Sequence, residues 1–137
     1  MYFVYNSLSI NSAQARNGDA TVKFLTMSAP AKINLSLDIT GKLDNGYHSL
    51  EMILQTISLK DEIVLEKQNE GISIECNQPL VPLDDSNICY KAARIFFLKT
   101  GIQGGVKIKI DKKIPIGAGL AGGSTNAAAA LKGLNAL

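Results

Sequence analysis

The sequence of 137 residues is 46% hydrophobic and 19% charged, and its 14 basic and 12 acidic residues leave a formal net charge of +2. This length and composition predict one compact, soluble domain and exclude a disordered chain. The near balance of charge, the few aromatic residues and the lack of Trp argue against a nucleic-acid-binding surface. No apolar run approaches the roughly 18 residues that a membrane-spanning helix needs, so no membrane partner is expected.

Residues 1–20 are a lead-in to which we assign no function, and the predicted domain covers residues 21–137. The lead-in has no basic region ahead of an apolar stretch, so a secretory signal is not indicated and a cytoplasmic protein is expected. Arg16 and the Ser and Asn content also resemble an organelle transit peptide, and a plastid protein would be expected if residues 1–26 formed one. Met27 is an alternative start.

Alternation of apolar and polar residues predicts a series of strands in the first half of the domain. VKFLT (22–26) is followed by AKINLSLDI (31–39), in which one face holds Ile33, Leu35, Leu37 and Ile39 and the other Lys32, Asn34, Ser36 and Asp38. Asp44, Asn45 and Gly46 form a strong turn signal. SLEMILQTISL (49–59) fits a strand or a short helix, and its Thr and Ile residues favour a strand. DEIVLEK (61–67) and GISIEC (71–76) read as further strands.

Helical spacing replaces strand alternation after Asp85. In SNICYKAARIFFLKTG (86–101), Ser86 or Asn87 suits the helix start, Gly101 suits its end, and the apolar face comprises Ile88, Ala92, Ile95 and Phe96. VKIKI (106–110) is another strand, with its Val and Ile residues inward. A second helix is predicted from Ser124, with an apolar stripe of Leu131, Leu134 and Leu137. This order of elements predicts an α+β fold.

Cys76 and Cys89 are the two cysteines. Reduced thiols in or near the core are the favoured interpretation, and a disulfide is the alternative. The single His and the two Cys have no ligand spacing and cannot supply the four donors of a zinc site, so no metal ligands are assigned.

The stretch PIGAGLAGGSTN (115–126) places bare backbone beside a helix start. N–H groups at a helix start have no partner within the helix and lie at the positive end of its dipole. Gly and Ala leave these groups open, so a phosphate can approach closely, and Ser124 and Thr125 add hydroxyl donors. The stretch therefore predicts an anion site, most plausibly for a polyphosphate.

The stretch also resembles three other patterns. Gly117, Gly119 and Gly122 match the dinucleotide pattern G-x-G-x-x-G, but residues 111–116 separate the strand from the glycines and too few residues follow for the acidic partner. A Walker A loop needs Lys where Gly123 stands. A purely structural turn, with Ser124 and Thr125 as helix caps, stays open.

PAKINLSLDITGK, DNGYHSLEMI and PIGAGLAGGSTNAAAAL occur in the order seen in the GHMP kinases, and the chain resembles this family over residues 23–137. Ala118, Ala121 and Thr125 stand where many relatives carry Gly, Gly and Ser, and all three are small. The resemblance implies the family's amino-terminal domain, a ribosomal-protein-like α+β fold with a left-handed β-α-β crossover. It also implies transfer of the γ-phosphoryl of ATP, with Mg²⁺, to the C2 hydroxyl of the methylerythritol unit of a cytidyl-diphosphate substrate in the non-mevalonate isoprenoid pathway.

The resemblance also assigns the site residues. The residues expected to hold ATP phosphates are Pro115, Ile116, Gly117, Ala118, Gly119, Leu120, Ala121, Gly122, Gly123, Ser124 and Thr125. Lys32 resembles the family's catalytic lysine, and Asn34, on the same strand face, is expected to bind the same substrate. Tyr47 is expected to stack on the cytosine and His48 to hydrogen-bond its edge. Each of these four side chains is also consistent with an ordinary surface or turn residue.

Lys112 and Lys113 are interpreted either as cations that attract ATP or as a solvated turn. The family pairs its lysine with an Asp from a Gly-Ala-Asp segment, and the sequence contains no such segment. The chain also stops on the apolar stripe of its last helix, so a downstream part and a second domain are expected, and residues 1–137 alone are predicted to form a partial site. Two rivals remain, namely another GHMP kinase, such as one acting on mevalonate or homoserine, and a non-catalytic binding module.

Overall fold

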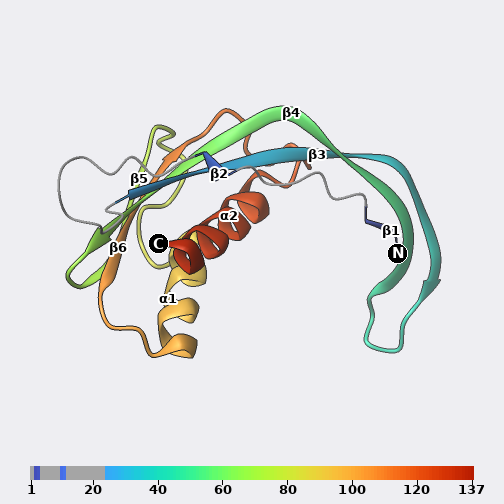
Figure 1. Ribbon diagram of the computed structural model, residues 1–137. Coiled ribbons are helices and arrows are strands. Elements are labelled where there is room, and N and C mark those ends of the chain that lie inside the picture. Colours follow the sequence, from blue (N-terminus) through green and yellow to red (C-terminus); the bar gives the residue numbers. More distant parts are fainter. Residues whose placement is uncertain (1, 4–9, 12–23) are drawn as a thin grey trace.

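A single mixed sheet carries two helices on one of its faces (Figure 1). The computed structural model describes residues 2–3, 10–11 and 24–137. The hydrogen-bonded strand order is β2-β3-β4-β6-β5, with β1 beside β4. The elements are β1 (Tyr2–Phe3), β2 (Ile10–Asn11), β3 (Phe24–Lys42), β4 (His48–Gln68), β5 (Gly71–Cys76), α1 (Ile88–Thr100), β6 (Gly105–Asp111) and α2 (Gly122–Ala136). The α+β expectation is thereby confirmed.

β3 and β4 form one long antiparallel hairpin, paired from Phe24 opposite Glu66 to Lys42 opposite His48. The two strands predicted before the turn are thus a single strand, and 49–59 and 61–67 are likewise parts of one strand, which settles the first of these as a strand rather than a helix. Register shifts near Pro30 and near Asn34 interrupt the ladder of β3. Such irregularities let a strand bend and tolerate a proline, and the hairpin bends toward the side that carries the helices (Figure 1).

Burial changes abruptly along β3. Leu25, Met27, Ala29 and Ala31 alternate into the core, all at most 4% exposed. The apolar face of the strand beyond Lys32 is not buried, because Ile33, Leu35, Leu37 and Ile39 are 36–64% exposed. The hairpin extends past the helices at this point (Figure 1), so neither described helix covers that part of the sheet. In this part of β3, strand alternation therefore predicted the strand correctly but did not predict burial.

β5, α1 and β6 form a β-α-β unit with parallel strands, in which Ile74 pairs with Ile108. Asn87 caps α1, since its Oδ1 accepts a hydrogen bond from the Cys89 N–H at 2.8 Å, and Gly101 ends the helix in the left-handed conformation with φ 70°. Val106, Ile108 and Ile110 are buried as predicted. The left-handed sense of the crossover stays a prediction.

The buried faces of both helices are shifted from the predicted ones. α1 buries Cys89 and Ala93, whereas Ile88 and Ile95 are about half exposed. α2 begins at Gly122 rather than Ser124, and it packs through small residues, Ala127, Ala129, Ala130 and Gly133, together with Leu134. Small side chains let a helix pack closely against its neighbours. Each helix therefore buries mainly its small residues rather than its largest apolar ones.

Both cysteines are free thiols, as favoured from the sequence, and Cys89 is only 1% exposed. Within residues 24–137 and the two short strands before them, no three His, Cys, Asp or Glu side chains gather as a metal site would require. Neither helix in the described part of the chain has the length and apolar character needed to cross a membrane.

Candidate functional site

The glycine loop, residues 115–121, turns the chain from β6 into α2 by left-handed backbone at alternate positions. Gly117, Gly119 and Ala121 have φ values of 72°, 73° and 63°. Ala121 is the only non-glycine residue with positive φ in the described part of the chain. L-residues other than Gly adopt this conformation at a cost of about 1–2 kcal/mol. Gly117 and Gly119, two of the four glycines in residues 115–126, therefore meet a conformational requirement.

The start of α2 is left open. Ala121, the residue before the helix, provides no side-chain cap, and the first turn contains no acidic residue. Gly122 and Gly123 add no side chains that could cover the N–H groups. Thr125 directs its hydroxyl inward, donating to the carbonyl oxygens of Ala121 and Gly122 at 3.2 and 3.1 Å, while Ser124 is exposed. An uncovered helix start of this kind has the N–H groups and the dipole that favour an anion.

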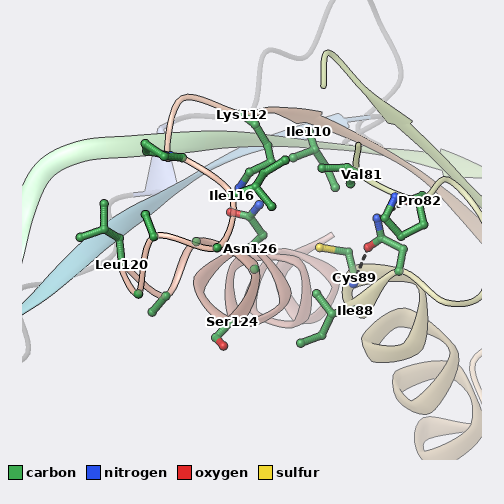
Figure 2. A pocket seen from close by; sticks show the side chains of 18 of the residues that line it. Val81, Pro82, Ile88, Cys89, Ile110, Lys112, Ile116, Leu120, Ser124 and Asn126 are labelled. Carbon is green, nitrogen blue, oxygen red and sulfur yellow. Dashed lines mark hydrogen bonds between the residues drawn. The ribbon is translucent and has the colours of Figure 1, made fainter. Parts of the chain in front are cut away.

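A cavity of about 480 Å³ adjoins this helix start (Figure 2). The glycine loop forms one wall, and Val81, Pro82 and Ile88 form an apolar wall opposite. This volume lies within the range of roughly 300–1,000 Å³ typical of small-molecule sites. The combination of open N–H groups and an apolar wall suits a ligand with an anionic part and a flat apolar part.

Lys32 lies against the loop. Its main-chain N–H donates to the carbonyl oxygen of Leu120 at 3.1 Å, which joins β3 to the glycine loop. The Lys32 ammonium donates to Asn34 Oδ1 at 3.1 Å, so the two side chains share a face as the alternation predicted. Residues far apart in sequence are thus brought together, because this contact places the main chain of Lys32 against the loop that precedes α2.

Tyr47 and His48 lie elsewhere, at the end of the β3–β4 hairpin. The predicted turn is present, with Gly46 at φ 84° and the Leu43 N–H donating to the Tyr47 carbonyl at 2.7 Å. Tyr47 is 73% exposed and His48 is exposed too. Lys42, the partner of His48, follows Lys32 by ten residues, which is roughly 33 Å of strand path. The described residues therefore do not bring this pair to Lys32.

Lys112 does not lie in a solvated turn, which was one of the two interpretations offered for it. Its side chain is only 6% exposed and its ammonium pairs with Asp61 Oδ2 at 2.6 Å. Because Lys112 also lines the cavity, its role as a cation that attracts ATP stays a prediction. Lys113 is 59% exposed and pairs with Asp111 at 3.3 Å. Asp61 was missed, although a signal existed: it occupies the same strand face as Ile63 and Leu65, an unusual place for a carboxylate.

Asn126 was also missed. It is 3% exposed, lines the cavity, and its Oδ1 has no hydrogen-bond partner among the described residues (Figure 2). A buried acceptor without a partner costs about 1–3 kcal/mol. The available signal was a polar side chain at the start of an alanine-rich helix.

Comparison with known proteins places this geometry in a family. Residues 87–137 match the family described as GHMP kinases N terminal domain. The chain belongs to the GHMP kinases, in the part that corresponds to their amino-terminal domain.

Individual relatives share one name. The chain is 53% identical over 113 residues to 4-diphosphocytidyl-2-C-methyl-D-erythritol kinase of Acetivibrio thermocellus, which is 82% of this chain and 40% of that protein. It is 53% identical over 114 residues to the kinase of the same name from Clostridium perfringens, with the same coverage of 82% and 40%. The chain thus spans less than half the length of these relatives.

Solved structures agree on the fold. A crystal structure of 4-(cytidine 5'-diphospho)-2C-methyl-D-erythritol kinase superposes with a TM-score of 0.70 at 38% identity, covering 81% of this chain and 40% of that one. A homoserine kinase from Cytophaga hutchinsonii gives a TM-score of 0.63 at 18% identity, covering 90% and 38%. A mevalonate kinase gives 0.60 at 22% identity, covering 82% and 40%. The last two show the fold alone.

Proposed function

We propose that residues 21–137 are the ATP-loop-bearing domain of a kinase that phosphorylates 4-diphosphocytidyl-2-C-methyl-D-erythritol at its C2 hydroxyl. The observation that carries this proposal is the uncovered start of α2, together with the hydrogen bond from the Lys32 main-chain N–H to the Leu120 carbonyl, which joins β3 to the loop before that helix. The relatives that carry this kinase's name support the choice of substrate.

Residues 115–125 hold the phosphates of ATP through the open N–H groups at the start of α2. The apolar wall of Val81, Pro82 and Ile88 suits the flat face of a nucleobase. Phosphates and base then occupy one cavity, which fixes the direction in which the γ-phosphoryl points.

The side chains of the described residues provide only some of the ligands that Mg²⁺ requires. No acidic cluster lies in the described part of the chain, and Mg²⁺ is commonly held by phosphate oxygens with one or two carboxylates. Ser124, exposed in the first turn of α2, is the hydroxyl of this chain placed to contact the ion. The ion would supply positive charge that neutralises the phosphates.

Lys32 acts on the reacting atoms. Its ammonium stabilises the negative charge that develops on the attacking hydroxyl oxygen and on the transferring phosphoryl group. Asn34 holds the Lys32 ammonium through its Oδ1 and binds the same substrate through its amide. The acidic partner that the family provides is proposed to lie in the part of the relatives that this chain does not span.

Tyr47 and His48 bind the cytidyl group, so the bend of the hairpin has to bring them over the substrate. The discriminating measurement is a titration of the chain with CDP and CMP. Binding that is lost in Tyr47→Ala and in His48→Ala supports the cytidyl substrate. Competition by mevalonate or homoserine but not by CDP would transfer the proposal to another GHMP kinase, and salt-dependent RNA binding without ATP binding would favour a non-catalytic module.

Lys32→Ala tests the catalytic assignment in an intact enzyme that contains this segment. We expect turnover to fall by a factor of about 10²–10⁴, while the dissociation constant for ATP changes by less than about threefold, because the charge that Lys32 stabilises develops only in the transition state. Steady-state kinetics and a nucleotide titration provide the two numbers. Equal losses in both would make Lys32 a binding residue only.

A further inference from the structure

Asp61 is a charged side chain in the interior of β4. It is 0% exposed and lies in the same alternation as Ile63 and Leu65, which belong to the core. Carboxylates are almost never fully buried unless they are paired and hydrogen-bonded. The function proposed above assigns no role to this residue.

The Asp61 carboxylate makes its hydrogen bonds to three consecutive residues at the entrance of the glycine loop. Oδ1 accepts hydrogen bonds from the main-chain N–H groups of Lys113 and Ile114 at 2.7 and 2.8 Å. Oδ2 accepts from the Lys112 ammonium at 2.6 Å. One carboxylate therefore holds the chain immediately before Pro115.

The same segment packs against the exit of the loop. A Cβ atom on Gly122, the first residue of α2, would lie 3.0 Å from Ile114 Cγ2 and 3.1 Å from Lys112 Nζ. Ile114 is itself only 2% exposed. The entrance and the exit of the loop are thus in contact, and Asp61 fixes the entrance.

An ion pair alone does not explain a carboxylate at this position. Buried ion pairs are often no more stabilising than apolar side chains of similar volume. A carboxylate oxygen, in contrast, can accept two main-chain N–H groups at once, which no apolar side chain can do. The geometry points to the N–H groups of Lys113 and Ile114 as the reason for the residue.

We infer that Asp61 is a positioning residue: it orients the entrance of the glycine loop through the Lys113 and Ile114 N–H groups and so sets the shape of the nucleotide cavity. Lys112 balances the buried charge and lies at the cavity wall. The inference rests on the proposed function for its effect on nucleotide binding, but its effect on the loop does not depend on that function.

Two neutral double variants separate the hydrogen bonds from the charge. Asp61→Asn with Lys112→Gln keeps an oxygen for the two N–H groups and an amide-to-amide contact. Asp61→Leu with Lys112→Met has similar volume and no acceptor. Both avoid the unpaired buried charge that a single substitution would leave. Glu66→Gln, which removes the exposed pair with Lys109 on the same strand, is the matched control.

Amide hydrogen exchange measures how firmly the loop entrance is held, and calorimetric titration with ATP measures the affinity of the cavity for the nucleotide. In Asp61→Leu with Lys112→Met we expect exchange at Lys113 and Ile114 to accelerate by about 100-fold or more and ATP binding to weaken by about tenfold or more. In Asp61→Asn with Lys112→Gln, and likewise in Glu66→Gln, the exchange rates and the ATP affinity should stay within about threefold of those of the parent chain.

Unchanged exchange and unchanged ATP affinity in the Leu/Met variant would overturn the inference. An equal loss in both double variants would also overturn it, because the charge and not the acceptor would then matter. If the parent chain binds no ATP, the proposed nucleotide function fails, and the exchange data still decide whether Asp61 positions the loop.

Discussion

At the scale of single residues, the four glycines of residues 115–126 have different physical roles. Gly117 and Gly119 adopt positive φ with open space around them, so they serve the turn itself. Gly122 is packed against Lys112 and Ile114, whereas Gly123 has only Ile88 Cγ2 nearby, at 3.9 Å. The sequence predicted one shared role, close approach of a phosphate, and the structure distinguishes three.

Gly122→Val is expected to weaken ATP binding, but for a different reason from the one the sequence indicates. The added carbons point toward Lys112 and Ile114, so they push the loop entrance away. We expect about a tenfold or greater loss of affinity and a loss of about 1–3 kcal/mol in the free energy of unfolding. Calorimetric titration and denaturant unfolding measure the two quantities.

Gly123→Ala is the matched comparison, because its Cβ would make an ordinary van der Waals contact. Its stability should rise slightly or stay within about 0.5 kcal/mol of the parent, since Ala suits a helix better than Gly. If Gly122→Val behaved like Gly123→Ala, the tight contact between the two ends of the loop would not matter for binding.

Cys89 makes stability depend on pH in the alkaline range. Burial raises the pKa of its thiol to about 12, from an ordinary value of 9.0. The folded chain then keeps this proton after the unfolded chain has lost it. The stabilisation is fully present below about pH 9 and is lost as the pH rises toward 12, by up to about 1.4 kcal/mol per pH unit. Comparing the unfolding free energies of the parent and Cys89→Ala at about pH 8 and about pH 10 isolates this contribution. A constant difference between the two proteins would contradict it.

At the scale of elements, close approach between α2 and the sheet decides the packing. A Cβ atom on Gly133 would collide with Leu65 Cδ1 and lie 3.0 Å from Met27 Cγ. The open N–H groups lie at the start of α2. The distance of this helix from β3 and β4 therefore also sets the position of the loop exit. The predicted leucine stripe was only partly right, because Leu131 is 40% exposed and Leu134 is 8% exposed.

Gly133→Ala should therefore destabilise the domain, although Ala in place of Gly normally stabilises a helix by about 1 kcal/mol. The collision with a buried leucine outweighs the gain in helix propensity, and we expect a net loss of about 1–3 kcal/mol in unfolding free energy. Thermal or denaturant unfolding measures it. Asn135→Ala, on an exposed position of the same helix, is the control. A stabilised Gly133→Ala variant would show that the helix can move away from the sheet without loss.

At the scale of the whole molecule, only some parts of the proposed site lie close together. Lys32, Asn34 and the glycine loop are joined by hydrogen bonds, while Tyr47 and His48 lie at the far end of the hairpin. The chain spans 40% of the length of its relatives, and its sequence has no Gly-Ala-Asp segment. We expect the purified 137-residue chain to bind ATP and to show little or no phosphoryl transfer.

A coupled assay with the cytidyl-diphosphate substrate tests this expectation, with a full-length relative as the positive control. Turnover within about tenfold of that relative would contradict it and would require a general base among residues 1–137. Aspartates near the motifs, such as Asp38 and Asp44, would then be the first substitutions to examine.

The local sequence by itself determined the element types, the hairpin turn at Gly46, the cap at Asn87 and the glycine-rich helix start, because each depends on backbone preferences within a few residues. Burial was decided only by the tertiary structure: an exposed strand at Ile33 and a buried carboxylate at Asp61 depend on which layer lies above them, and that layer comes from distant parts of the chain. The contact of Lys32 with Leu120 joins β3 to a loop that is distant in sequence. The sequence identified the lysine and the helix start separately, and only folding brings them together.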